Sequence, residues 1–309
     1  MNEEKLGERF LFTQAFLYAL FPIIIHYGVG RMPAILYAGI STVIAGIILF
    51  FHFLWKRNLN RIFNRKVILP MIGVTLFIVI FPSLLIFTGT KSTSAINTAL
   101  LLQIEILFAL IICGIFFKEK MTKIKIFGAL LLFAGGILLV SNGTIEIHRG
   151  DLLILMGTFM YPFGNICAKK ALKVVSPSIL LCFRAFFGGM TLLIISFFTE
   201  SWRADYFISI KDVLILLVNG FFVMFLAKIL WYEGLKRVDV TKATAIGVAF
   251  PPALSFLLAI IFFKEAPTFY QIGGFFLIMM GLFVMTRQRK IRVKKAEEEF
   301  SLRDSQDHP

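Results

Sequence analysis

The chain has 309 residues, of which 58% are hydrophobic and only 16% are charged, and its mean hydropathy is +0.85. This composition lies outside the usual range of soluble domains and excludes most soluble enzymes and binding modules. The net charge of +14 could suit a nucleic-acid-binding protein, but the basic residues lie between long apolar segments, so we expect a lipid bilayer as the partner and no nucleic acid.

The apolar segments follow one another along almost the whole chain. A bilayer core of roughly 30 Å requires about 20 apolar residues in a helix, and their near-continuous apolarity is unlike the alternation of barrel strands. The sequence therefore predicts an all-α integral membrane protein of ten transmembrane helices, with connections too short to hold a separate domain. The ten segments are Phe10–Tyr27, Ala34–Trp55, Val67–Thr88, Ala95–Phe117, Ile124–Val140, Leu152–Ala168, Ile179–Phe198, Val213–Tyr232, Ala243–Phe263 and Tyr270–Met285.

The ends of the chain and the basic residues predict the orientation. Residues 1–9 are an acidic leader, and the apolar stretch that follows lacks a small-residue cleavage motif, so we expect it to be a retained span. Residues 287–309 are a charged tail that we expect to be largely disordered. With ten spans both ends lie on one side, and that side holds 24 of the 32 Lys and Arg residues. Because cytoplasmic loops carry the excess of basic residues, we expect a multi-pass protein of the plasma (inner) membrane with both termini cytoplasmic.

An internal repeat relates the two halves of the chain. The stretch FFKEKMTKIKIFGALLLFAGGILLV from Phe116 aligns without gaps with FFKEAPTFYQIGGFFLIMMGLFVM from Phe262, at an offset of about 146 residues. Charged and glycine positions match as well as apolar ones, which favours a true repeat. The sequence predicts two five-helix repeats, 10–141 and 150–286, which an odd number of spans places in opposite orientation. Such inverted repeats are typical of secondary transporters.

With these features the chain resembles the EamA family of the drug/metabolite transporter superfamily. The resemblance rests on the repeat length, on the ten spans, on the Lys-Glu pairs that end the fourth and ninth spans, and on MYPFGNICAKKAL at 160–172. It implies a ten-helix fold and the movement of a small organic solute. The first repeat departs from the pattern, with Leu20-Phe21-Pro22 in place of a clear copy of 160–172 and with Glu105 at the position paired with Pro251.

Ionisable residues inside the spans are the leading candidates for a functional site, because a charge near the bilayer centre is costly unless it is paired or hydrated. Glu105 lies near the middle of the fourth span and shares a helix face with Thr98. Lys228 lies in the eighth span, close to Trp231 and Tyr232. A cation beside two aromatic rings could receive a carboxylate or phosphate while the rings hold an apolar body. The alternative is a structural ion pair of Glu105 with Lys228, or a Lys228 that extends to the cytoplasmic face.

The ninth span adds a second group of candidates. Pro251 and Pro252 should kink this helix, and the freed carbonyl groups should face a cavity or another helix. Thr244 and Ser255 share a stripe with Pro251, and we expect the three to line the pathway. Asn165 in the sixth span is a weaker candidate, because a simple interhelical hydrogen bond explains it equally well. For Arg184 in the seventh span, we expect a role in helix packing or a side chain that extends to the membrane surface, rather than a role in the binding site.

Together these residues predict a secondary transporter that moves a small organic metabolite, amino-acid-like or a related polar solute, by alternating access. Proton coupling and exchange both stay open, as do the substrate and the oligomeric state. The alternatives are an intramembrane lipid-modifying enzyme and a non-transporting membrane scaffold. Neither HExxH nor GxSxG occurs in the chain, and its three cysteines have no metal-binding spacing, so we expect no enzyme, no metal site and no cofactor.

Overall fold

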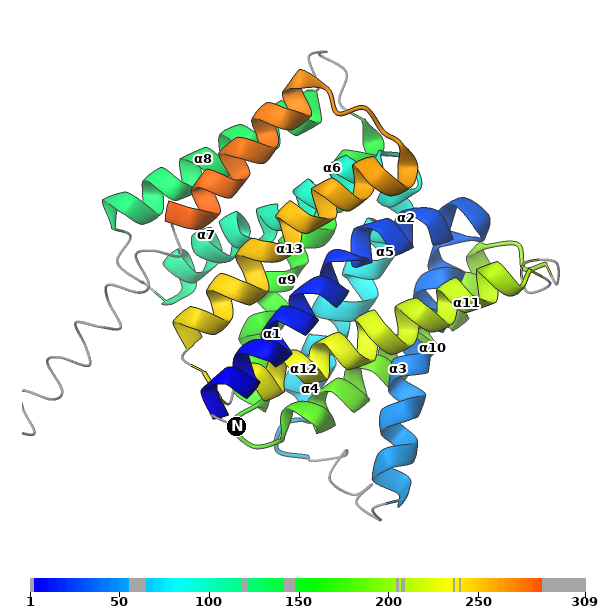
Figure 1. The fold of residues 1–309 in the computed structure, drawn as a ribbon. Helices are drawn as coiled ribbons and strands as arrows, with labels where there is room; N and C mark the ends of the chain where they lie inside the picture. The colour runs from blue at the N-terminus through cyan, green and yellow to red at the C-terminus, as the bar shows by residue number, and fades with distance from the viewer. Residues whose placement is uncertain are drawn as a thin grey trace, which may run out of the picture.

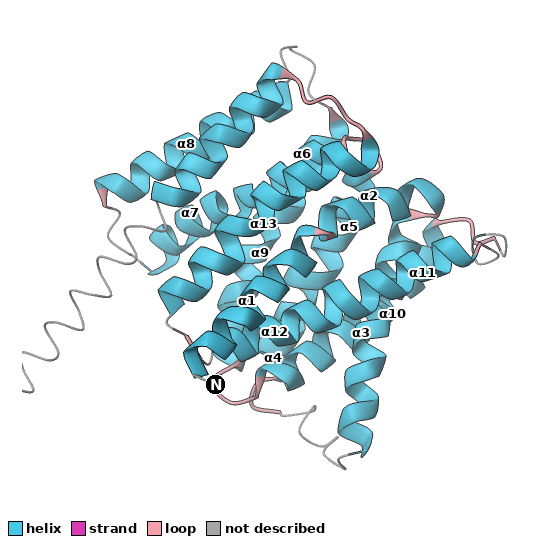
Figure 2. Cartoon of the chain, viewed as in Figure 1, coloured by secondary structure: helices cyan, strands magenta, loops and turns pink. Residues whose placement is uncertain are grey.

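The computed structural model describes residues 3–55, 65–117, 122–141, 148–203, 206, 209–235, 237–238 and 240–284. Throughout these residues the regular structure is helical and no strand occurs (Figure 2). The helices are α1 (Glu3–Ala19), α2 (Phe21–Arg31), α3 (Ala34–Trp55), α4 (Ile68–Val74), η2 (Thr75–Ile80), α5 (Phe81–Thr90), α6 (Ala95–Leu101), η3 (Leu102–Ile104), α7 (Glu105–Phe117), α8 (Lys123–Ser141), α9 (Arg149–Ala171), α10 (Pro177–Thr199), α11 (Ile210–Val218), η5 (Asn219–Leu226), α12 (Ala227–Leu235) and α13 (Val240–Phe263), followed by a last apolar helix, Phe269–Val284.

The apolar helices coincide in position with the predicted segments. Seven of the described helical stretches are long and apolar enough to cross a membrane, and three shorter apolar helices, Ile126–Val140, Phe250–Phe263 and Phe269–Val284, occupy the places of the fifth, ninth and tenth predicted spans. The chain is thus an all-helical, multi-pass membrane protein.

The first helix begins earlier than the sequence predicts. Helix α1 starts at Glu3 rather than at Phe10, so most of the predicted leader is helical. Its first turns pack on the turn after α12, where Arg237 makes an ion pair with Glu3 at 3.0 Å and a second one with Glu233 at 2.6 Å. Apolar periodicity does not extend into this polar segment, so its helical state depends on the tertiary contact.

Several helices change their geometry within the bilayer-length stretches. The third and the eighth predicted spans each contain a π-helical segment, η2 and η5, and the fourth contains the 3-10 turn η3. Such segments leave the regular hydrogen-bond pattern, and π-helical segments inside α-helices are frequent at functional sites. The double proline lies inside α13, which is helical from Val240 to Phe263.

Glycines set the closest helix contacts. A Cβ atom at Gly46 of α3 would lie 2.5 Å from the backbone nitrogen of Phe186 in α10, and one at Gly189 would lie 2.7 Å from the backbone nitrogen of Val43. Helices α3 and α10 therefore meet backbone to backbone, side by side at the lower right of Figure 1. Small residues at such crossings let helices approach closely in a membrane.

The last helix pairs with α8 through a reciprocal set of glycines, at the upper left of Figure 1. A Cβ at Gly135 would lie 3.0 Å from the carbonyl oxygen of Gly274, and one at Gly281 would lie 2.8 Å from that of Gly128. The sequence repeat pairs Gly128 with Gly274 and Gly135 with Gly281. If each glycine is replaced by its repeat equivalent, the Gly135–Gly274 contact becomes the Gly281–Gly128 contact. This exchange is the pattern that a two-fold relation between the halves produces.

Replacement of Gly46 by alanine should destabilise the fold. The new methyl group would overlap the backbone of α10, which cannot move as a side chain can, so the helices must separate at a cost of about 1–3 kcal/mol. We expect a lower thermal unfolding midpoint for Gly46→Ala in detergent. Gly30→Ala is the matched control, because no atom lies within 4 Å of a Cβ at Gly30. Equal midpoints for the two variants would contradict the close α3–α10 contact.

Candidate functional site

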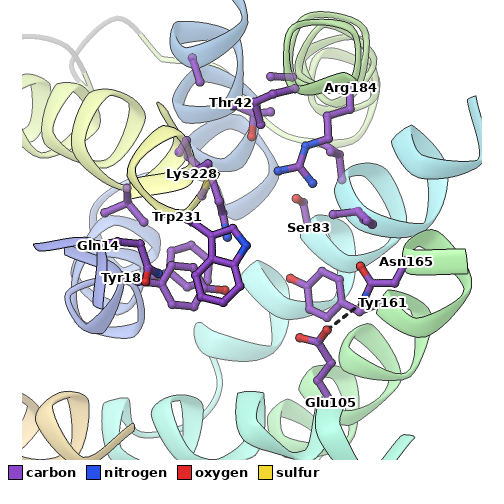
Figure 3. Close-up of a pocket in the computed structure, with 18 of the residues that line it drawn as sticks. Gln14, Tyr18, Thr42, Ser83, Glu105, Tyr161, Asn165, Arg184, Lys228 and Trp231 are labelled. Atoms are coloured by element: carbon purple, nitrogen blue, oxygen red, sulfur yellow. Dashed lines mark hydrogen bonds between the residues drawn. The ribbon is translucent and has the colours of Figure 1, made fainter. Parts of the chain in front are cut away.

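A cavity of about 340 Å³ lies between helices from both halves of the chain (Figure 3). The first half contributes residues such as Tyr18 of α1 and Glu105 of α7, and the second half contributes residues such as Tyr161 of α9 and Lys228 of α12. Both π-helical segments also reach the cavity, with Val79 of η2 and with residues of η5. The cavity is large enough for a small organic molecule.

Two cationic side chains enter this cavity. Lys228 is the second residue of α12, directly after η5, and its Nζ is 4.1 Å from the centroid of the Tyr18 ring. Arg184 of α10 also lines the cavity, and its guanidinium group points inward in Figure 3. The ring face of Tyr18 partly compensates the Lys228 charge. The remaining positive charge makes the cavity attractive to an anionic group of a ligand.

Glu105 is the acidic group of the cavity, at the first residue of α7 and directly after the 3-10 turn. The Asn165 side-chain amide donates a hydrogen bond to its Oε1 at 3.3 Å. Among the ion pairs of the described residues, none joins Glu105 to Lys228 or to Arg184. The structural ion pair that the sequence left open is therefore not formed in this conformation, and Lys228 is directed into the cavity rather than away from it.

Aromatic rings form much of the remaining wall. In Figure 3 the Tyr161 ring lies between Arg184 and Glu105, and Tyr18 and Trp231 lie beside Lys228. The Tyr18 ring stacks on Phe21 with centroids 5.8 Å apart, which holds it in place. Beside them, Gln14 is 4% exposed and its Oε1 has no hydrogen-bond partner. A buried acceptor without a partner is costly and is suited to a donor on a ligand.

The described residues that the sequence predicts for the site line the main cavity, a smaller cavity or neither of them. Glu105, Lys228, Trp231 and Asn165 meet at the main cavity. Pro251 and Ser255 line a smaller adjoining cavity of about 160 Å³, to which Glu105 also belongs.

Thr98 lines neither cavity: it is fully buried, and its hydroxyl donates to the carbonyl oxygen of Ser94 at 3.0 Å. The side chains of Tyr232 and Thr244 fall outside the described residues.

Six polar residues of the main cavity were missed or assigned another role at the sequence level. Arg184 was interpreted as a packing or extended residue, and the residues not proposed are Gln14, Tyr18, Thr42, Ser83 and Tyr161. A signal was present, since each is a polar side chain inside an apolar segment. Their positions along different spans gave no indication that they face one another.

A buried polar network joins the helices at the ends of α6, α9 and the last helix. Asp151 is fully buried, and its carboxylate accepts hydrogen bonds from the Thr93 hydroxyl and from the Asn97 amide. The Asn97 Oδ1 in turn accepts a hydrogen bond from Gln271 at 2.9 Å. At this network the start of α9 meets the turn before α6, since a Cβ at Gly150 would lie 2.7 Å from the carbonyl oxygen of Ser92. In Figure 1 this end of the helices is remote from the N-terminus.

Carboxylates cap two helices at the same end. The Glu265 side chain, which belongs to the second Lys-Glu pair of the repeat, accepts hydrogen bonds from the backbone N–H groups of Ala95 and Ile96, at 3.1 and 3.2 Å. Glu200 accepts equivalent bonds from Ile35 and Leu36, at 3.0 and 2.8 Å. A carboxylate at a helix N-terminus satisfies N–H groups that the helix leaves without partners. The motif residue Glu265 therefore has a structural role that joins α13 to α6.

The described residues contain no group of three His, Cys, Asp or Glu side chains that could hold a metal ion. The polar chemistry of the cavity thus consists of two cations, one carboxylate, amides and hydroxyl groups. These groups can bind and orient a polar solute.

Known proteins similar to the chain are transporters by name. The chain is 26% identical to the uncharacterized transporter YyaM of Bacillus subtilis (strain 168) over 261 residues, which is 82% of this chain and 83% of YyaM. It is 25% identical to an uncharacterized transporter of Archaeoglobus fulgidus over 244 residues, 76% of this chain and 81% of that protein. A known crystal structure matches the fold with a TM-score of 0.67 and 19% identity, over 93% of this chain and 99% of the other.

A family model accounts for nearly the whole chain. The model of the EamA-like transporter family matches twice, at residues 5–141 and at 148–287. The two matches correspond to the two halves between which the cavity lies. The chain therefore belongs to the EamA-like transporter family.

Proposed function

We propose that this protein is a secondary transporter that moves a small organic solute with a carboxylate group, amino-acid-like or related, by alternating access. The observation that carries the proposal is the cavity of about 340 Å³, in which two cations face one carboxylate across a wall of aromatic rings. Lys228 and Arg184 would bind the carboxylate of the solute. Glu105 and the unpaired Gln14 Oε1 would bind a donor such as an amino group.

Alternating access requires two halves that can exchange conformations, and several observations support such an arrangement. The reciprocal glycine contacts of α8 with the last helix are those expected of two inverted five-helix repeats. The π-helical segments η2 and η5 occur in the third helix of each half, and both reach the cavity. We therefore assign the repeats to residues 10–141 and 150–286, in ten transmembrane helices.

The polar network around Asp151 would close the cavity toward one side of the membrane. Together with Glu265 it joins helices of the two halves at the end remote from Glu3. If the excess of basic residues lies in the cytoplasm, as we propose, this end faces outward and both termini are cytoplasmic in the plasma (inner) membrane. Breaking and re-forming these hydrogen bonds would accompany each transport cycle.

Transport can be tested directly with purified protein in proteoliposomes. We expect a carboxylate-bearing solute from a metabolite panel to raise the unfolding temperature, because a ligand at about 100 times its Kd stabilises by about 2.7 kcal/mol. The same solute should show saturable counterflow without ATP. The proposed function is contradicted if no carboxylate-bearing solute of the panel binds to the protein and if proteoliposomes exchange these solutes no faster than empty liposomes do.

The inverted arrangement has its own test. Single tags inserted after Phe117 and after Phe263 should be accessible from opposite sides of the membrane in intact cells. Access of both tags from the same compartment would contradict the inverted repeats, whatever the solute.

A further inference from the structure

The smaller cavity adjoins the main cavity at Tyr18 and Tyr161, which line both. Its volume is about 160 Å³, and it shares Tyr18, Phe21, Glu105, Tyr161 and Gly247 with the main cavity. These residues therefore stand at the passage between the two cavities. We call the smaller cavity the side chamber, and the residues that line it alone are Pro22, Leu102, Gln103, Ile106, Pro251 and Ser255.

Two interrupted helices and Pro251 of α13 meet at the side chamber. Helix α1 ends at Ala19 and α2 begins at Phe21, with Pro22 in its first turn. The 3-10 turn η3 supplies Leu102 and Gln103, and α13 supplies Pro251. Interrupted backbone at membrane depth occurs where it lines a cavity or packs on protein, because freed carbonyl groups cannot face lipid. The convergence indicates a built chamber rather than an accidental gap in the packing.

The repeat relation places this chamber between the two halves. Glu105 and Pro251 are paired by the offset of 146 residues, and both line the chamber. The Ser255 hydroxyl crosses it at one edge and donates to the carbonyl oxygen of Ala19 at 2.8 Å. This bond satisfies one of the carbonyl groups at the α1–α2 break. Neither the Ser255 hydroxyl nor this carbonyl oxygen therefore requires a polar group of a ligand as its partner.

Apart from Gln103, Ser255 and the polar side chains shared with the main cavity, the wall is apolar. Phe21, Leu102 and Ile106 face the space together with the rings of Pro22 and Pro251. An apolar cavity of roughly 150 Å³ is large enough for benzene. The side chamber at about 160 Å³ therefore matches one six-membered ring or a branched aliphatic group and is too small for a fused double ring.

We propose that the side chamber is the subsite for an apolar arm of the transported solute, which rests on the proposed function of the main cavity. The carboxylate of the solute lies against Lys228 and Arg184, and its arm passes Tyr18 and Tyr161 into the chamber. The solute class is thus a small carboxylate with one apolar arm no larger than a single ring. Leu102 and Ile106 set the upper limit on the size of that arm.

The proposal is tested by binding of two matched solute series to the full-length protein in lipid nanodiscs, measured by calorimetry. One series is alanine, leucine, phenylalanine and tryptophan, and the other is the four carboxylates that lack their amino groups. We expect the affinity of the wild type to rise from the alanine arm to the phenylalanine arm and to fall for the indole arm. A pocket discriminates roughly tenfold or more for each methylene that fits or clashes.

Variants of the chamber should change this order. Ile106→Ala enlarges the chamber, so the affinity for the indole arm should rise about tenfold relative to the alanine arm. Ile106→Phe fills the chamber, so the phenylalanine arm should lose about tenfold relative to the alanine arm. Leu102→Ala gives a second enlargement if Ile106→Ala does not fold. Ile111→Ala is the matched control, because Ile111 lies on the same helix and is 44% exposed on the outer surface.

The outcomes separate the two proposals. Arg184→Gln should weaken all arms of a series by the same factor, since it acts on the shared carboxylate. If the wild type binds a series but the chamber variants leave the order of arms unchanged, the side chamber is not the arm subsite and the proposed function stands. If the wild type binds neither series, the proposed function fails and the subsite with it.

Discussion

The Lys228→Ala variant should bind the transported solute about 10–100 times more weakly than the wild type while it folds normally. Lys228 lines the cavity, and none of the ion pairs of the described residues joins it to a carboxylate, so its removal breaks no contact ion pair of the fold. A hydrogen bond to a charged group contributes about 1.5–3 kcal/mol, and each 1.4 kcal/mol is about tenfold in affinity. Counterflow into proteoliposomes measures the loss.

The controls of this experiment separate binding from folding. Lys228→Arg keeps the positive charge and should retain part of the affinity. Lys211→Ala removes an exposed lysine at the start of α11, far along the same span, and should transport as the wild type does. A loss of folded protein in Lys228→Ala that equals the loss of transport would assign Lys228 a structural role instead.

Asp151→Ala should lower the thermal stability by more than any surface substitution. The Asp151 carboxylate is fully buried and accepts hydrogen bonds from Thr93 and Asn97. Its removal leaves the buried Asn97 amide and the half-buried Thr93 hydroxyl without this acceptor, and a buried donor left unpaired costs about 1–3 kcal/mol. The unfolding midpoint in detergent should therefore fall by several degrees.

Two further variants make this result specific. Asp151→Asn keeps the shape and one acceptor oxygen, so its midpoint should lie between those of the wild type and Asp151→Ala. Arg149→Ala changes an exposed side chain two residues away and should leave the midpoint unchanged. A midpoint for Asp151→Ala that equals that of Arg149→Ala would show that the network around Asp151 contributes little to stability.

The main features of the site could be predicted because charge inside an apolar segment is conspicuous. Glu105 and Lys228 were found in this way, and both line the cavity. The other cation, Arg184, was recognised as intramembrane but was assigned to packing, since its distance from the end of a span allows either role. Thr98 was predicted for the site because it shares a helix face with Glu105, but the 3-10 turn η3 lies between the two residues and changes the register of that face.

By itself, the sequence determined the class of this protein: a helical membrane protein of the EamA-like family whose two halves share a repeat and whose spans carry a few charges. Only the tertiary structure decided which polar residues meet. In a soluble helix the apolar stripe reveals the inward face, but a membrane helix is apolar on every side, so its sequence does not say which face packs inward. That direction is set by contacts such as the Gly46 crossing of α3 with α10, which brings Arg184 of α10 and Thr42 of α3 into the wall of the same cavity.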